Sequence, residues 1–417
     1  MIKILKIKSL LIQISIFSFI FLWDIKYDIY QLRYLIIVPL LLILINFKNI
    51  NYNLFLKYSL VPLFILTHFL LVNIPTGINL ENRDIFGIIL LFTIFYVSLF
   101  YKDEILDHLD KYINWFIIIF SILFVLFFIL SDSKIILNCY NGWFYQTKLI
   151  FVENSHFALI AVPIINYYSL VFCELKNFSK NNKIIFSFFV IFLIISFLNF
   201  STTFLVGLIL TNFYLLIFHR DNLKIKILSI IFIFVSFFII FNKSECTQRS
   251  INSLQTLPQY FKYSILNKPN FKYLDAEKKE KTNINMSVET LLTSLQISFK
   301  SLKSNPFGVG FNKYQEAHKK FIDEVILLDP DIRKNNIYDG SSNISKLVTE
   351  FGIFGIIFII TFIYTTLKFK KIESKKIFLI SIIFLQFLRG VGYFNGGFLL
   401  LVIIYFYNYL KIREIND

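Results

Sequence analysis

The chain has 417 residues, of which 56% are hydrophobic and 52 are Phe, and its formal net charge is +15. With a mean hydropathy of +0.66, it carries more apolar side chains than the core of a soluble protein of this size can bury. The basic residues lie in short segments between apolar runs rather than in one patch, which argues against a nucleic-acid partner.

Apolar runs predict about 12 transmembrane helices, because a bilayer core of roughly 30 Å needs about 20 apolar residues per helix. The runs cover residues 9–23, 34–47, 58–74, 85–101, 112–131, 156–173, 184–199, 202–218, 226–241, 345–367, 377–389 and 392–410. The first run ends at Trp23 without the small-residue cleavage site of a signal peptide, so we expect it to be retained. The expected fold is all-α and polytopic: nine helices within 1–241, one large loop at 242–344, and three helices and a tail in 345–417.

The distribution of Lys and Arg predicts the orientation of these helices. Basic residues are concentrated at the N-terminus and in alternate short segments, which the positive-inside rule places in the cytoplasm. In this topology the chain is embedded in the lipid bilayer and both termini are cytoplasmic. The loop 242–344 is extracytoplasmic. The same topology places Cys139 and Cys246 outside, where they either form a disulfide or remain unpaired thiols.

Within the large loop, residues 286–304 have the apolar spacing of an amphipathic helix, which could lie on the membrane or pack over the helical bundle. Its apolar positions are Val288, Leu291, Leu292, Leu295, Phe299 and Leu302. Pro306 ends this helix, and Gly308 and Gly310 permit a tight turn or a positive φ. A plain turn remains the simpler interpretation of the two glycines.

The chain re-enters the apolar region after Ser341-Ser342-Asn343. Ser341 or Asn343 can cap the incoming helix, while Gly352 and Gly355 allow close helix packing. Glu350 is unusual in this apolar stretch. Such a carboxylate either faces protein or a water-filled cavity, or reaches the membrane interface.

Five segments together resemble one known family. They are Asn305–Tyr314, Ser341–Gly355, Glu153–Ala158, Ser201–Thr203 and Arg389-Gly390. In order and spacing around one large outer loop, they resemble the O-antigen polymerase and ligase superfamily of polysaccharide assembly, which is GT-C-like in fold. The motifs cover about fifty residues, and the topology covers the whole chain.

Two positions qualify the resemblance. Ligases of the superfamily carry a His, then Asn, Ser or Gln, nine residues and Gly-x-x-Gly; here Ser341 occupies the histidine position and Ser342 the next. This favours a polymerase over a ligase. Family members often have an Arg where the amphipathic helix opens, whereas this chain has Ser287-Val288-Glu289, so another basic residue would take that role.

The resemblance implies transfer of a growing glycan from undecaprenyl pyrophosphate to a hydroxyl of the next lipid-linked repeat unit, without a metal or other cofactor. A flippase and a chain-length regulator are the implied protein partners, and a bacterial inner membrane the implied location. The leaving pyrophosphate requires fixed cations, a task suited to Arg. Arg389 is the strongest candidate for a catalytic cation. The candidates for substrate binding are Arg249, Arg333, Lys313, Gly308, Gly310, Ser341 and Ser342.

The acceptor hydroxyl requires a base. Glu153 and His156 are three residues apart and share one helical face if the helix starts early, so the carboxylate could orient the imidazole. Glu350 is the rival base. In the simpler interpretation Glu153 and His156 are polar flanks of a transmembrane helix, and Arg389 is an interface anchor.

Three other functions remain as alternatives. A ligase would attach finished glycan to lipid A core. A polysaccharide or lipid transporter would require paired half-repeats, and the sequence has no evident internal duplication. A non-catalytic scaffold of envelope assembly would tolerate single Arg or Glu substitutions. The sequence contains no HExxH, paired CxxC or Walker motif.

Overall fold

The computed structural model shows a helical protein. It describes residues 2–24, 26–27, 30–45, 52–73, 82–130, 140–141, 144–145, 154–175, 179–199, 201–218, 222–241, 286–325, 333–369, 373–390 and 392–414. Two antiparallel pairs of two-residue strands, β1 (Lys26–Tyr27) with β2 (Tyr30–Gln31) and β3 (Tyr140–Asn141) with β4 (Phe144–Tyr145), accompany the helices. The predicted all-α class is therefore confirmed.

The helices follow the apolar runs. In the first part of the chain they are α1 (Ile2–Phe21), the 3-10 turn η1 (Leu32–Ile36), α2 (Ile37–Ile45), α3 (Tyr52–Asn73), α4 (Asn82–Leu130), α6 (Asn154–Glu174), α7 (Lys180–Leu198), α8 (Thr202–Phe218) and α9 (Leu223–Phe241). In the last part they are α11 (Met286–Ser304), α12 (Tyr314–Phe321), the 3-10 turn η5 (Ile322–Glu324), α13 (Asn343–Phe351), α14 (Ile353–Lys368), α15 (Glu373–Leu388) and α16 (Gly396–Glu414).

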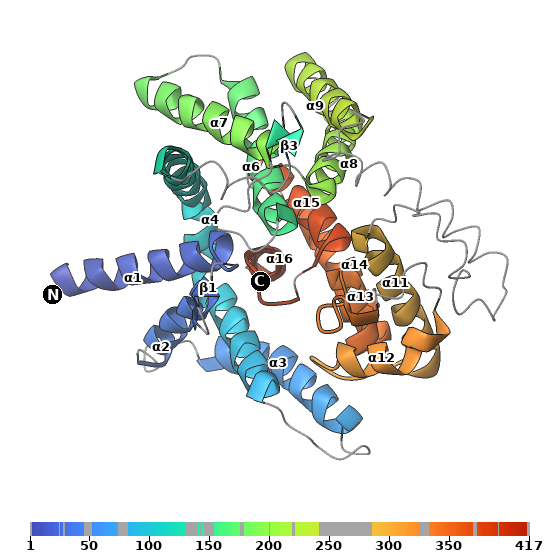
Figure 1. Ribbon diagram of the computed structural model, residues 1–417. Helices are drawn as coiled ribbons and strands as arrows, with labels where there is room; N and C mark the ends of the chain where they lie inside the picture. The colour runs from blue at the N-terminus through green and yellow to red at the C-terminus, as the bar shows by residue number, and fades with distance from the viewer. Residues whose placement is uncertain are drawn as a thin grey trace, which may run out of the picture.

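The C-terminal helix α16 occupies the centre of the molecule, where Figure 1 shows it nearly end-on. It packs against α1, α4, α14 and α15, and α15 packs in turn against α6 and α8. The core between them is almost entirely Phe, Ile, Leu and Val. Helices α11 and α12 lie together at one side, against α13 (Figure 1).

Within the described residues, three helical segments are long and apolar enough to cross a membrane: Asp84–Leu126, Ser155–Glu174 and Lys180–Leu198. Shorter apolar helices cover Ser9–Phe21, Leu32–Ile45, Ser59–Val72, Thr202–Phe218, Ile353–Lys368 and Gly396–Asn408. So many apolar helices are typical of a membrane protein, because the core of a soluble protein does not need this number of them.

Two transmembrane helices that the sequence predicts form one continuous helix in the structure. The runs 85–101 and 112–131 form the single 49-residue helix α4. The intervening segment, Lys102 to Lys111, contains neither Gly nor Pro, so nothing interrupts the backbone hydrogen bonding. At 1.5 Å per residue α4 is about 70 Å long, well beyond one bilayer core of roughly 30 Å. The prediction of two separate helices joined by a cytoplasmic loop is therefore wrong.

The prediction of one helix over residues 345–367 is also wrong, because this segment forms two helices. Gly352, at φ 57°, separates α13 from α14. Glu350 consequently belongs to the short helix α13, outside the apolar segment Ile353–Lys368. The cap is Ser342, between the two residues expected to provide it: its Oγ accepts the backbone N–H of Ser345 at 3.2 Å.

The amphipathic helix α11 has the predicted bounds, and its polar face is the buried one. Ser294 and Ser298 are buried, whereas Leu295 and Phe299 are 40% and 59% exposed. Ser298 donates its hydroxyl to the Ser345 carbonyl at 2.9 Å. Because serine is small, α11 approaches α13 closely, and its apolar stripe faces outward, as expected of a helix lying on a membrane.

Candidate functional site

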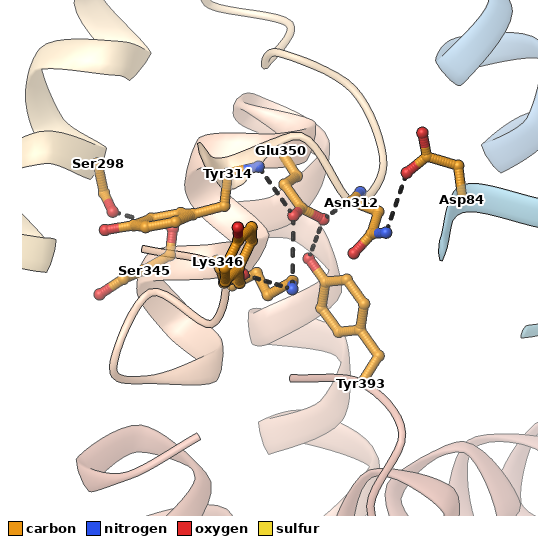
Figure 2. Close-up of polar contacts among 9 residues, drawn as sticks. Asp84, Ser298, Asn312, Tyr314, Ser345, Lys346, Glu350 and Tyr393 are labelled. Carbon is orange, nitrogen blue, oxygen red and sulfur yellow. Dashed lines mark hydrogen bonds and ion pairs between the residues drawn. The ribbon is translucent and has the colours of Figure 1, made fainter. Parts of the chain in front are cut away.

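The candidate site is built around Glu350, whose carboxylate is fully buried. One oxygen accepts the backbone N–H of Asn312 at 2.9 Å and the hydroxyl of Tyr393 at 2.8 Å; the other accepts the backbone N–H of Tyr314 at 3.2 Å. Lys346, one turn earlier on α13, places Nζ 3.7 Å from Glu350 Oε1. Figure 2 shows these groups converging on the carboxylate from three segments of the chain.

Residues 305–313, which we call the strap, wrap over the end of α13. The backbone N–H groups of Val309 and Gly310 donate to the carbonyls of Thr349 and Glu350 at 3.0 and 2.9 Å. Gly308 has a φ of 87°, and a Cβ there would collide with the Glu350 carbonyl. The glycines of the strap therefore permit a close backbone contact with α13, which confirms their predicted positive φ.

The glycine motif after Glu350 meets the same strap. A Cβ on Gly352 would collide with the Pro306 carbonyl and lie 2.6 Å from the Gly308 nitrogen. The Ile353 N–H donates to the Pro306 carbonyl at 2.9 Å. Two motifs separated by more than forty residues in the sequence are thus halves of one packed structure.

A second buried carboxylate, Asp84 at the start of α4, holds the other end of the strap. It accepts Nδ2 of Asn312 at 3.1 Å and Nζ of Lys313 at 3.0 Å. Asn312, at φ 62°, therefore uses its backbone N–H for Glu350 and its side chain for Asp84 (Figure 2). Lys313, expected to contact substrate, is instead paired with Asp84 and Glu316.

Burial and the surrounding hydrogen-bond donors have opposite effects on the pKa of Glu350. Burial raises the pKa of Glu350, while Lys346 and the three hydrogen bonds act in the opposite direction. Burial therefore favours the neutral carboxyl group, and the surrounding donors favour the charged carboxylate. Because its oxygens already have donors and are shielded from solvent, Glu350 is suited to holding α13, the strap and Tyr393 together rather than to deprotonating a bulky acceptor.

Arg389 and Gly390 lie directly beside Ser341 and Ser342. The Gly390 N–H donates to the Ser341 carbonyl at 3.0 Å, and a Cβ on Gly390 would lie 2.7 Å from the Ser342 carbonyl carbon. Ser341, at φ 58°, turns the chain at this contact. Arg389 is half-buried at the end of α15. Three segments predicted from the sequence, the strap, Ser341–Gly355 and Arg389-Gly390, thus occupy one region.

A buried amide network ties this region to α15 and α16. Nδ2 of Asn343 donates to Oε1 of Gln386, and Nε2 of Gln386 donates to Oδ1 of Asn395 at 3.1 Å. Asn395 also caps α16, accepting the Phe398 N–H at 3.0 Å. In a low-dielectric interior hydrogen bonds of this kind are strengthened, and they restrict the arrangement of the helices that they join.

His156 contacts a carboxylate that is distant in the sequence. Its Nδ1 lies 2.9 Å from Oδ2 of Asp24, and both side chains are buried. Glu153, the expected partner, lies outside the described residues. Trp23 packs on the imidazole with ring centres 5.4 Å apart, and it lines the same small cavity as Gln386 and Asn395. A carboxylate-oriented imidazole therefore lies next to the amide network.

Of the other predicted residues, Arg333 pairs through Nη2 with Oδ1 of Asp323 at 2.7 Å. Arg249, Cys139 and Cys246 lie outside the described residues. The residues that sequence reasoning missed are Asp24, Asp84, Asn312, Lys346 and Tyr393. Two had a local signal: Lys346 is one helical turn from Glu350, and Asp84 is a lone carboxylate at the start of an apolar run.

In the part of the chain that the structure describes, no group of three or more His, Cys, Asp or Glu side chains is placed to hold a metal ion. The charged side chains of the candidate site are Arg389, Lys346, Lys313, Glu350 and Asp84. Comparisons with models of protein families, with curated proteins and with solved structures gave no match.

Proposed function

We propose that this chain is a membrane glycosyltransferase that polymerises lipid-linked oligosaccharide repeat units, using a polyprenyl-pyrophosphate donor and no metal. In this proposal it is a polytopic protein of a bacterial inner membrane, with the loop 242–344 and the candidate site on the extracytoplasmic side. The leaving group is a lipid pyrophosphate, and the acceptor is a sugar hydroxyl of the next repeat unit.

One observation carries the proposal: Gly390 is hydrogen-bonded to Ser341, which brings Arg389 to the α13 segment and the strap. These segments were selected from the sequence by their resemblance to one superfamily. Their convergence supports a common role, because unrelated loop motifs have no reason to pack together. The contact also places Arg389, which is partly buried, at the end of an apolar helix, and a guanidinium in such a position is suited to binding a pyrophosphate.

The proposal assigns roles to three side chains. Arg389 binds the pyrophosphate and stabilises the charge that develops on it as the glycosidic bond breaks. The imidazole of His156, oriented by Asp24, accepts the proton of the acceptor hydroxyl. Glu350 is a positioning residue that holds α13 and the strap in place. The serine at position 341 continues to favour a polymerase over a ligase.

The test is a strain lacking this chain, complemented with variants and examined for its lipid-linked and surface glycans. Arg389→Ala should leave lipopolysaccharide with a single repeat unit while the protein accumulates in the membrane normally. Arg389→Lys should restore part of the chain-length ladder. A matched control is Arg333→Ala, since Arg333 is paired with Asp323 in the outer region, and it should give a normal ladder.

The alternatives predict different products. Loss of a ligase leaves no repeat unit on the lipid A core. Loss of a transporter leaves lipid-linked repeat units facing the cytoplasm. A scaffold gives an unaltered ladder with Arg389→Ala, and that result would remove Arg389 from the site.

A further inference from the structure

An apolar cavity of about 230 Å³ lies directly beneath the candidate site. Its walls come from α3, α4, α14 and α16, and half of its lining side chains are aromatic. For comparison, an apolar cavity of about 150 Å³ in another protein stays dry and binds benzene.

The roof of the cavity is made by residues of the site. Phe311 belongs to the strap, and its ring stacks on Tyr393 with centres 5.9 Å apart. Phe351 follows Glu350 and packs on the same tyrosine at 6.3 Å. The Tyr393 ring faces the cavity, its hydroxyl donates to Glu350, and Lys346 Nζ lies 5.3 Å from its centre. One side chain therefore separates the apolar space from a buried cation and carboxylate.

The side wall on α14 connects the cavity to the outer apolar surface of the bundle. Ile357 lines the cavity and is 50% exposed, and Ile360 on the same helix is 60% exposed. Thr361, which also lines the cavity, donates its hydroxyl to its own helix at the Ile357 carbonyl. The wall is therefore apolar throughout, and a hydrocarbon chain would enter it from a surrounding bilayer without breaking a hydrogen bond.

We propose that this cavity holds part of the hydrocarbon chain of a lipid, inserted from the bilayer past α14, with the lipid's anionic headgroup on the side of Lys346. A chain that arrives from the bilayer gains mainly from close contact with the aromatic walls. The identity of the lipid as a polyprenyl carrier rests on the proposed function; the existence of the site does not.

The experiment uses the purified full-length protein in nanodiscs with two photoactivatable probes, a diazirine-bearing polyprenyl phosphate and a diazirine-bearing phosphatidylglycerol. Cross-linked peptides are identified by mass spectrometry. Thr361→Trp fills the cavity from α14, and Ile360→Trp places the same indole one residue away on the exposed face. We expect the polyprenyl probe to label peptides of α4 and α16, and Thr361→Trp to reduce that labelling at least tenfold while Ile360→Trp leaves it unchanged.

The other outcomes overturn the proposal in different ways. Equal labelling in both tryptophan variants would show that the cavity is not the binding site. Labelling by phosphatidylglycerol that excess polyprenyl phosphate does not displace would identify a bilayer lipid and overturn the carrier assignment. A normal glycan ladder with Arg389→Ala, alongside cavity labelling sensitive to Thr361→Trp, would reject the proposed function and retain the lipid site.

Discussion

The backbone N–H of Asn312 donates to the carboxylate of Glu350 at 2.9 Å across a sequence separation of 38 residues. The same asparagine extends its side chain to Asp84, so one residue of the strap joins two buried carboxylates. The strap is thereby fixed at both ends. The position of everything that contacts it, including Tyr393 and Gly352, depends on those two acids.

Replacing Glu350 tests this dependence. Glu350→Ala leaves two backbone N–H groups and the Tyr393 hydroxyl without their acceptor and removes the anionic partner of Lys346, so we expect a loss of about 3 kcal/mol in the free energy of unfolding. Glu350→Gln keeps one carbonyl oxygen as an acceptor and should lose less. Thermal unfolding in detergent micelles measures both. Equal stability of the alanine variant and the natural protein would mean that the carboxylate does not hold the strap.

The strap glycine is a second test, and it separates backbone geometry from charge. Gly308→Ala puts a Cβ against the Glu350 carbonyl at a φ of 87°, and we expect at least 2 kcal/mol of destabilisation together with loss of long glycan chains. Gly87→Ala is the matched control. Its Cβ would meet the Phe311 ring at an ordinary 3.4 Å in a helix, so stability should change by less than about 1 kcal/mol.

The Asp84 to Lys313 ion pair is open to a double-mutant cycle. Asp84→Asn and Lys313→Met each leave a buried charge without its close partner, and each should cost about 3 kcal/mol. The double variant Asp84→Asn/Lys313→Met removes both charges and should cost clearly less than the sum of the two. Strict additivity of the three unfolding free energies would show that the two residues do not interact.

Local patterns predicted local structure well. The bounds of α11, the positive φ of Gly308 and Gly310, and the helix end at Pro306 follow from spacing and backbone sterics within a few residues. The burial of the polar face of α11 was not predictable from its own sequence pattern, because an apolar stripe normally predicts that the apolar face is buried. Only the serine-rich partner surface on α13, through Ser345 and Thr349, explains which face turns inward.

The site itself depends on distant pairings that no local pattern encodes. His156 and Asp24 are 132 residues apart, and Lys313 and Asp84 are 229 apart. Proximity in sequence suggested Glu153 for His156, which is the natural choice when only one helix is considered. The resemblance to a superfamily did group the strap, α13 and Arg389, because it supplied the relation between segments that spacing cannot.

The region formed by α11 and α12 should lose stability in acid through His318. This side chain is buried on α12 against Tyr314, and burial lowers its pKa from 6.5 to about 4. Between those values the unfolded chain binds a proton that the folded chain does not, so stability falls as pH decreases from about 6.5 to 4, by about 3 kcal/mol. Thermal unfolding of the full chain across this range measures the slope. His318→Phe should flatten it, and His108→Gln, on α4, should leave it intact; an unchanged slope in His318→Phe would assign the acid sensitivity to another group.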